Sequence, residues 1–131
     1  MDIRRISSGS AFETVAGYSR AVVVEHGAHA EVFVSGCTGF DYSNMTITDD
    51  VAEQARQCFV NIALALKEAG GDLSHVVRVR YYFPDSADWD RLAPVFGEVL
   101  GAVRPAATAL VCGLVDVRMK IEIEADARIP R

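Results

Sequence analysis

The chain has 131 residues and a formal net charge of −5, with 50% hydrophobic and 24% charged residues. This length and mix predict one globular domain over residues 1–131. Phosphate binding needs clustered Lys and Arg. Because Arg4 and Arg5 form the only adjacent basic pair, we expect no nucleic-acid partner. No apolar run reaches the roughly 20 residues that cross a bilayer, and we expect neither a membrane partner nor a secretory signal.

The cysteines and histidines predict no metal site and no cofactor. The three cysteines, Cys37, Cys58 and Cys112, lack CxxC spacing and are predicted to be free thiols in a reducing cytoplasm. The three histidines show no ligand-pair spacing with them. We therefore assign the histidines to surface or turn positions and predict a cytoplasmic protein.

The first third of the chain is predicted to be β structure. Apolar runs at Ile3–Ser7, Tyr18–Val24 and Glu31–Ser35 predict three strands. A glycine-containing turn at 26–29 separates the last two strands. A glycine-punctuated loop then runs through Gly36–Asn44.

The middle of the chain changes to a helical period. From Asp50 the apolar residues recur at steps of three and four, which predicts a helix that stops at Gly70–Gly71. Val77–Phe83 alternates between unlike side chains and predicts a strand that Pro84 ends. Asp88–Leu100 is expected to form a second helix.

The last third returns to β structure at Thr108–Leu114 and Lys120–Arg128. Strict alternation in the final segment puts Glu122 on the face opposite the isoleucines. The order βββαβαββ predicts an α+β fold with two helices packed on one face of a mixed sheet. The opposite face would still carry residues such as Tyr82 and Leu110, so we expect self-association.

Five short segments, taken in chain order, resemble motifs of the RidA (YjgF or L-PSP) family. They are Ala16–Val22, Val34–Gly36, Ala55–Gln57, Val76–Val79, and the C-terminal signature formed by Arg104–Thr108 with Lys120–Ala125. The resemblance covers nearly the whole chain. It implies the RidA fold, which resembles that of chorismate mutase and assembles as a homotrimer with pockets between neighbouring subunits.

The resemblance also implies a reaction. In the family's imine deaminases, an Arg after Pro-Ala pairs with the carboxylate of a 2-imino acid or enamine. A Glu on the last strand positions the hydrolytic water, and a Tyr from the N-terminal motif closes the site. Matched residue by residue, these positions are Ala107, Glu122 and Tyr18. The resemblance thus implies a small-molecule hydrolase with Glu122 as its catalytic carboxylate and, because the cation is lost, an altered specificity.

Further residues complete the predicted substrate-binding set. Arg20, Arg78 and Arg80 are candidate replacements for the lost cation. Arg20 is the first of them, because it stands where the family motif usually has Gln. Gly36 is predicted to line the pocket, and Thr108 to offer its hydroxyl group. Arg104 lies close to the lost cation in sequence, but Pro105 is expected to direct it elsewhere, into a structural or interfacial role.

Structural roles compete with these assignments. Glu122 also suits a solvated residue of an amphipathic strand, and Glu124 is expected to pair with Arg78 or Arg80. Cys112 is expected to be a small buried hydrophobic residue rather than a nucleophile.

Two other functions stay open. One is a trimeric protein that binds a small metabolite without turnover, which the alanine at position 107 favours. The other is the endoribonuclease or translation-inhibitor activity associated with the family name. The acidic charge and the lack of an acid–base histidine pair argue against the latter.

Overall fold

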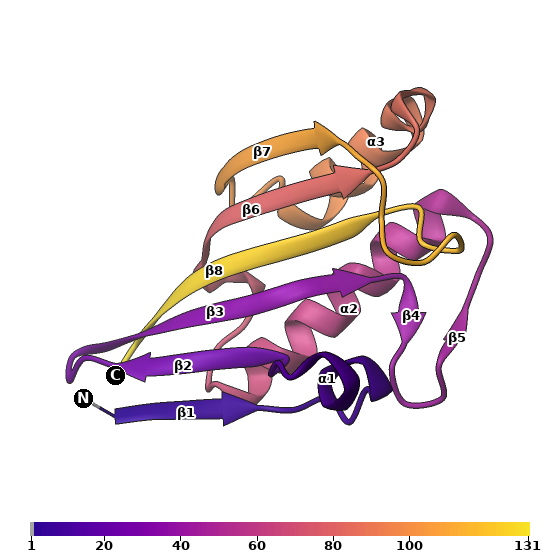
Figure 1. Cartoon of the computed structure of the whole chain (residues 1–131). Helices are drawn as coiled ribbons and strands as arrows, with labels where there is room; N and C mark the ends of the chain where they lie inside the picture. The colour runs from indigo at the N-terminus through magenta and orange to yellow at the C-terminus, as the bar shows by residue number, and fades with distance from the viewer. Residues whose placement is uncertain (1) are drawn as a thin grey trace.

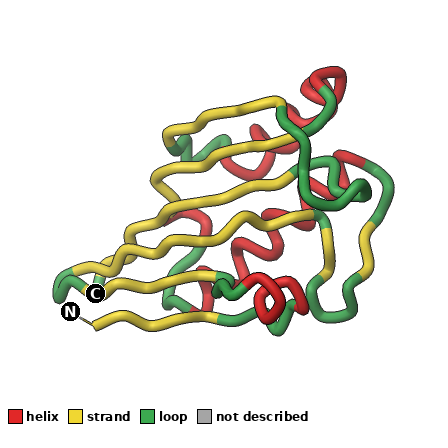
Figure 2. The backbone as a smooth tube through the Cα atoms, in the orientation of Figure 1, coloured by secondary structure: helices red, strands yellow, loops and turns green. Residues whose placement is uncertain are grey.

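The computed structural model describes residues 2–131, which form an α+β fold as predicted. A mixed six-stranded sheet has the order β1-β2-β3-β8-β6-β7, and helices α2 and α3 lie on one of its faces (Figure 1, Figure 2). The strands of this sheet are β1 (Asp2–Ile6), β2 (Ala21–Glu25), β3 (His29–Thr38), β6 (Val76–Phe83), β7 (Ala106–Val111) and β8 (Glu122–Pro130).

The remaining elements are short except for the two helices on the sheet. The α-helices are α1 (Ala11–Ala16), α2 (Val51–Glu68) and α3 (Trp89–Leu100). Strands β4 (Phe40–Asp41) and β5 (Thr46–Ile47) form a separate ribbon, and 3₁₀ turns occupy Leu73–His75 and Ser86–Asp88. Among residues 2–131, no helix has both the length and the apolar character to cross a membrane.

The chain order places the C-terminal strand in the middle of the sheet. Strand β8 pairs antiparallel with β3 on one side and with β6 on the other. Strands β6 and β7 are parallel, so their connection must cross over, and α3 forms that crossover. The start of β8 is therefore enclosed by both neighbours.

The core lies between the sheet and the two helices. Alternate residues of β8, namely Ile123, Ala125, Ala127 and Ile129, are buried beneath them, as the alternation predicts. Gln54 of α2 is also fully buried. Its amide nitrogen donates to the carbonyl of Arg118 at 2.9 Å, and its oxygen accepts from the backbone of Lys120 at 2.8 Å. This side chain therefore ties the segment before β8 to α2.

The N-terminal region differs from the prediction. The strand expected at Tyr18–Val24 begins at Ala21, because α1 precedes it and ends at Gly17 with φ 72°. Ser10 and Glu13 form a capping box that starts α1. The pattern Ser-x-x-Glu was readable in the sequence, but this helix was not predicted.

The outer edge of the sheet also differs. Strand β7 is exposed along its whole length, and the chain leaves the sheet after Val111. Cys112 therefore lies outside the sheet and is exposed, so the prediction that it is buried was wrong. The sheet face opposite the helices stays uncovered in one chain, with Phe33 46% and Leu110 52% exposed.

Candidate active site

Glu122 lies at the start of β8, between β3 and β6, where its backbone is paired with Thr38 and Tyr82. Its neighbours Ile121 and Ile123 are fully buried on the helix side. Alternation therefore places the half-buried Glu122 side chain on the face opposite the helices.

Gly36 makes room for the Glu122 carboxylate. The pairing of β3 with β8 shifts register between Val34 and Cys37, and this bulge contains Gly36. A Cβ atom at Gly36 would overlap the Glu122 carboxylate. Two predicted site residues are thus in direct contact, and the missing side chain of one positions the other.

The surroundings of Glu122 favour its protonated form. Burial raises the pKa of Glu122 above its ordinary value, the Glu124 carboxylate raises it further, and Arg20 partly opposes both. A raised pKa makes the Glu122 carboxylate a stronger proton acceptor than an ordinary one.

Glu124 belongs to a structural network, as predicted. It accepts a short hydrogen bond from the Tyr82 hydroxyl and lies 3.8 Å from the guanidinium of Arg80. The bond to Glu124, followed by burial, raises the pKa of Tyr82 to about 12. Tyr82 and Arg80 therefore hold the Glu124 carboxylate in place beside Glu122.

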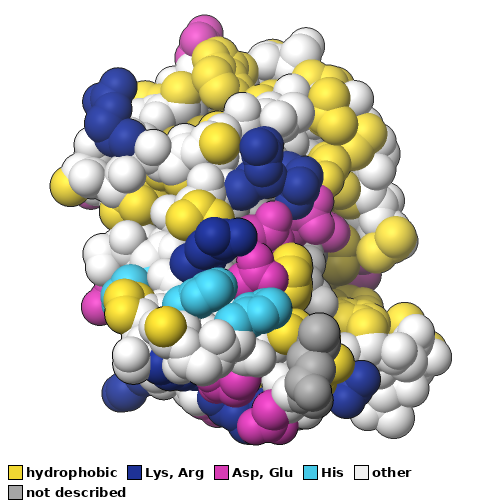
Figure 3. All heavy atoms as spheres, turned by 90° about the vertical axis from the view of Figure 1, so that its left-hand side faces the viewer, with side chains coloured by type: hydrophobic (Ala, Val, Ile, Leu, Met, Phe, Trp, Pro, Cys, Tyr) yellow, Lys and Arg dark blue, Asp and Glu magenta, His cyan; other side chains and the backbone are white. Residues whose placement is uncertain are grey.

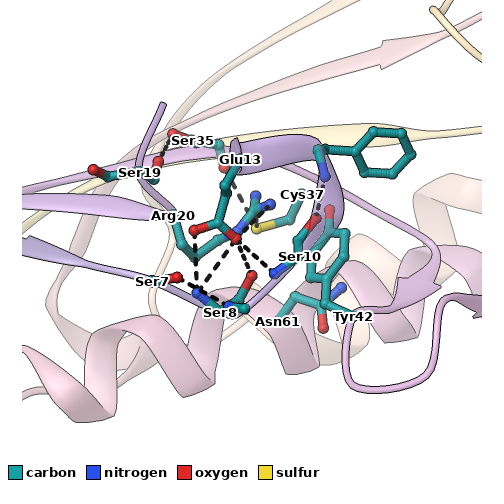
Figure 4. Close-up of polar contacts among 12 residues, drawn as sticks. Ser7, Ser8, Ser10, Glu13, Ser19, Arg20, Ser35, Cys37, Tyr42 and Asn61 are labelled. Carbon is teal, nitrogen blue, oxygen red and sulfur yellow. Dashed lines mark hydrogen bonds and ion pairs between the residues drawn. The ribbon is translucent and has the colours of Figure 1, made fainter. Parts of the chain in front are cut away.

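Arg20 lies in a buried polar cluster with Glu13, Cys37 and Tyr42 (Figure 4). It is 1% exposed, and its Nη1 donates to the Gly36 carbonyl at 2.8 Å. Its Cζ lies 4.3 Å from the centroid of the Tyr42 ring. Its Nε and Nη2 are buried and lack hydrogen-bond partners in the described part of the chain. A substrate would reach this predicted binding residue only after a rearrangement.

Glu13 is the counter-ion of Arg20 and was not singled out from the sequence. Its carboxylate lies 3.9 Å from the Arg20 guanidinium and accepts from the backbone N–H of Ser8 at 3.2 Å (Figure 4). Burial acts to raise the pKa of Glu13, but hydrogen bonds from Ser8 and Ser7, together with Arg20, outweigh it and lower that pKa. The pair is therefore ionised.

Tyr18 lies next to the Arg20 guanidinium. Its side chain is 38% exposed, and its ring centroid is 5.7 Å from the Arg20 Cζ. Burial raises its pKa, and the nearby Glu122 charge also contributes to the rise. We call Tyr18, Gly36 and Glu122, with Arg20 behind them, the carboxylate corner.

Ala107 and Thr108 lie on opposite faces of the sheet. In the parallel register, Ala107 pairs with buried Val79 and Thr108 with Arg80. Ala107 therefore faces α3, whereas Thr108 shares the face of Glu122. One chain does not bring Ala107 together with the carboxylate corner.

Ala107 lines a hollow of about 480 Å³ between α3 and β7, which we call the α3 hollow. Its lining residues are Tyr81, Trp89, Ala93, Phe96, Gly97, Leu100, Gly101, Arg104, Pro105 and Ala107. Arg104 is among these lining residues. The turn after α3 holds Arg104 at φ 53°, with its N–H bonded to the Leu100 carbonyl.

Another hollow, of about 710 Å³, lies between α2 and the end of β1. Its walls include Val60 and Leu64, which are 49% and 59% exposed. Arg20 touches this space, but its guanidinium is covered. Tyr18 and Glu122 do not line this hollow.

The chain resembles characterised proteins over almost its full length. A family model described as endoribonuclease L-PSP matches residues 8–129. The human 2-iminobutanoate/2-iminopropanoate deaminase is 32% identical over 127 residues, which cover 95% of this chain and 90% of the human protein.

Solved structures agree with the fold. A Mycobacterium tuberculosis member of the YjgF/YER057c/UK114 family is 36% identical, with a TM-score of 0.85 over 98% of this chain and all of that one. RidA from Psychrobacter is 32% identical, with a TM-score of 0.82 over 96% of this chain and 99% of that one. The chain therefore belongs to the endoribonuclease L-PSP family, the group of RidA and YjgF proteins.

Proposed function

We propose that this protein is a cofactor-independent hydrolase of the imine or enamine deaminase type. The observation that carries the proposal is Glu122, a half-buried carboxylate of raised pKa seated on the gap left by Gly36. The similarity to a human 2-imino acid deaminase supports the same reaction class. The free thiols support a cytoplasmic location.

The proposed reaction needs one positioned water and one proton carrier. Glu122 accepts a proton as the water oxygen bonds to the C=N carbon, and the π electron pair moves to nitrogen. Glu122 then returns the proton to nitrogen, which gives a carbinolamine. In the collapse, Glu122 carries the hydroxyl proton to nitrogen, the C–N bond breaks with its electron pair on nitrogen, and the C=O bond forms as ammonia leaves. Tyr18, at the edge of the corner, would help to exclude bulk water.

We further propose that complete sites form between copies of a homotrimer. Glu122 and Ala107 occupy opposite faces of the sheet in one chain, so a pocket that uses both needs a second copy. The uncovered sheet face and the exposed Val115 and Val117, at 90% and 98%, supply apolar surface for that contact.

The test is hydrolysis of 2-iminopropanoate, generated in place by an amino-acid oxidase. We expect the protein to speed ammonia release and to reduce semicarbazone trapping of the imine. Light scattering on the same sample should give three chains per particle. Rates equal to those without protein would refute the deaminase, and a monomer would refute the shared site.

Ala107 favours one alternative, a trimeric protein that binds a metabolite without turnover. The residue offers no charge to a substrate carboxylate, and breaking a buried ion pair by removing one partner costs about 3–5 kcal/mol. Saturable binding of a small carboxylate with no product released would identify this alternative. Substrate-binding roles for Thr108 and Arg20 stay predictions under either function.

A further inference from the structure

The α3 hollow has an aromatic wall. The rings of Tyr81 and Phe96 stack with centroids 3.8 Å apart, and Trp89 packs edge-on against Phe96 at 6.1 Å. Tyr81 and Phe96 are buried, whereas Trp89 is 42% exposed. A rigid aromatic surface that stays partly open to solvent can cover an apolar ligand group.

Small residues also line the hollow. Ala93 and Gly97 of α3 and Ala107 of β7 line it. A Cβ atom added at Gly97 would meet no heavy atom within 4 Å, so the space beside it is open. The volume, about 480 Å³, is within the range of small-molecule sites.

Among the residues that line this hollow, only Arg104 carries a charge. Its φ of 53° lies in the left-handed region, which glycine adopts without penalty and an arginine does not. Within residues 2–131 its guanidinium makes no hydrogen bond or ion pair, although its N–H bonds the Leu100 carbonyl. A favourable interaction with the C-terminal end of α3 is its simplest structural role. That role does not explain the apolar space next to it.

We infer that the α3 hollow binds small carboxylates that carry an aromatic or bulky aliphatic side chain. Arg104 pairs with the carboxylate, and the side chain lies between Trp89 and the small residues. Arg104 thereby supplies the cation that Ala107 lacks. This inference rests on the proposed function for its consequence, that the preferred substrates are 2-imino acids with large side chains.

Trp89, the single tryptophan of the chain, reports binding through its fluorescence. We expect 3-phenylpropanoate to give a saturable change and to bind more tightly than propanoate. Arg104→Gln should weaken 3-phenylpropanoate about 10- to 100-fold, as for a lost hydrogen bond to a charged group. The neutral 3-phenylpropanol should be unaffected by this substitution. Arg128→Gln, which removes the same charge from the remote pair with Glu31, is the matched control and should bind as wild type.

The variant Arg104→Gly distinguishes a loss of ligand binding from a loss of stability. Glycine suits the left-handed turn, so this variant should melt at a higher temperature and still lose the affinity for 3-phenylpropanoate. Equal affinity in wild type and Arg104→Gln, or no saturable binding, overturns the inference. Binding without imine hydrolysis refutes the proposed function alone. Hydrolysis of 2-iminopropanoate without 3-phenylpropanoate binding refutes this inference alone.

A second group of side chains lies at the far end of the sheet, on the β2–β3 hairpin. His26, His29 and Glu31 each offer one ligand atom, and these atoms lie within 4.8 Å of one another. His26 Nε2 is 3.0 Å from Glu31 Oε2, and the imidazole rings stack with centroids 5.0 Å apart. Figure 3 shows imidazoles side by side on this face, among acidic and basic side chains.

The geometry points to a binding site for a divalent transition ion such as Zn²⁺ on this hairpin. Imidazole nitrogens and a carboxylate are zinc ligands, and three of them leave a position for water. Arg128 holds the other Glu31 oxygen at 2.8 Å, which orients the carboxylate toward His26. His26 is exposed and the other two are half-buried, so small side-chain rotations suffice to bring the three atoms to a shared ion.

Zinc titration of the untagged protein by calorimetry tests this site. We expect about one ion per chain and a binding constant weakened about tenfold or more in His26→Ala and in His29→Ala. His75→Ala is the matched control, because His75 instead contacts the backbone of Asp72 on another element, and it should bind as wild type. Equal zinc binding by all variants, or none by wild type, overturns the assignment.

Discussion

Glu122→Gln is expected to lower kcat for imine hydrolysis by about 10²- to 10⁴-fold, the usual contribution of a general acid–base group. The amide has nearly the shape of the carboxyl group and still fits over Gly36, but it accepts no proton. Stopped assays of ammonia release from 2-iminopropanoate measure the loss. A kcat within threefold of wild type would remove Glu122 from the mechanism.

The same substitution should stabilise the fold at neutral pH. Burial and the Glu124 charge raise the Glu122 pKa above its ordinary 4.5, so the folded chain holds this proton to a higher pH than the unfolded chain. The stability linked to this proton is fully present below the unfolded pKa and is lost as the pH rises through the folded pKa. The gain in melting temperature of Glu122→Gln over wild type should therefore be positive at pH 7 and disappear below about pH 4.

Mixing inactive variants tests whether sites are shared. Ala107→Glu places a repelling carboxylate in the α3 hollow, whereas Glu122→Gln leaves that hollow intact. In trimers refolded from equal amounts, about one quarter of the contacts between neighbours join an intact Glu122 to an intact hollow. Activity near that fraction would support the shared site, and an inactive mixture would place each site within one chain.

The sequence predicted the elements that carry a strong period. Strict alternation in β8 places Glu122 opposite the buried isoleucines, and the apolar period of α2 predicts its buried face. These predictions succeed because only one face of each element is buried, and burial of one face gives a regular spacing of apolar residues in the sequence.

The sequence did not predict relations that depend on pairing between distant segments. Ala107 and Glu122 were assigned to a pocket between subunits, and the parallel pairing of β6 with β7, which turns Ala107 toward α3 within one chain, was not predicted. Arg104 was expected to have a structural or interfacial role, and its left-handed backbone conformation after α3, which is unusual for arginine, was not predicted. No local pattern carries this information.

The burial of Arg20 was also hidden. An arginine just before a strand is expected at the surface, and only the packing of α1 supplies Glu13 as its counter-ion. The Ser10-x-x-Glu13 capping box was the available signal. A capping box predicts where a helix begins. It does not predict that Glu13 will lie close to Arg20.

Arg20→Met should lower the free energy of unfolding by about 3–5 kcal/mol, as found when one partner of a buried ion pair is removed. The side chains of Arg20 and Glu13 are 2% and 6% exposed, so the substitution leaves the Glu13 carboxylate buried without its counter-ion. The Gly36 carbonyl also loses its donor. For a domain whose total stability is of the order of 5–15 kcal/mol, urea unfolding will detect this readily.

The double variant Arg20→Met/Glu13→Gln distinguishes the contribution of the ion pair to stability from the effect of changed packing. It removes both charges, so it should recover part of the loss, and the cycle of single and double variants gives the coupling between them. Arg128→Met is the matched surface control, because its pair with Glu31 is exposed and such pairs contribute about 0–1 kcal/mol. If Arg20→Met were no more harmful than Arg128→Met, the Glu13–Arg20 pair would not hold Gly36 in place. The bulge in β3 alone would then position the Glu122 carboxylate.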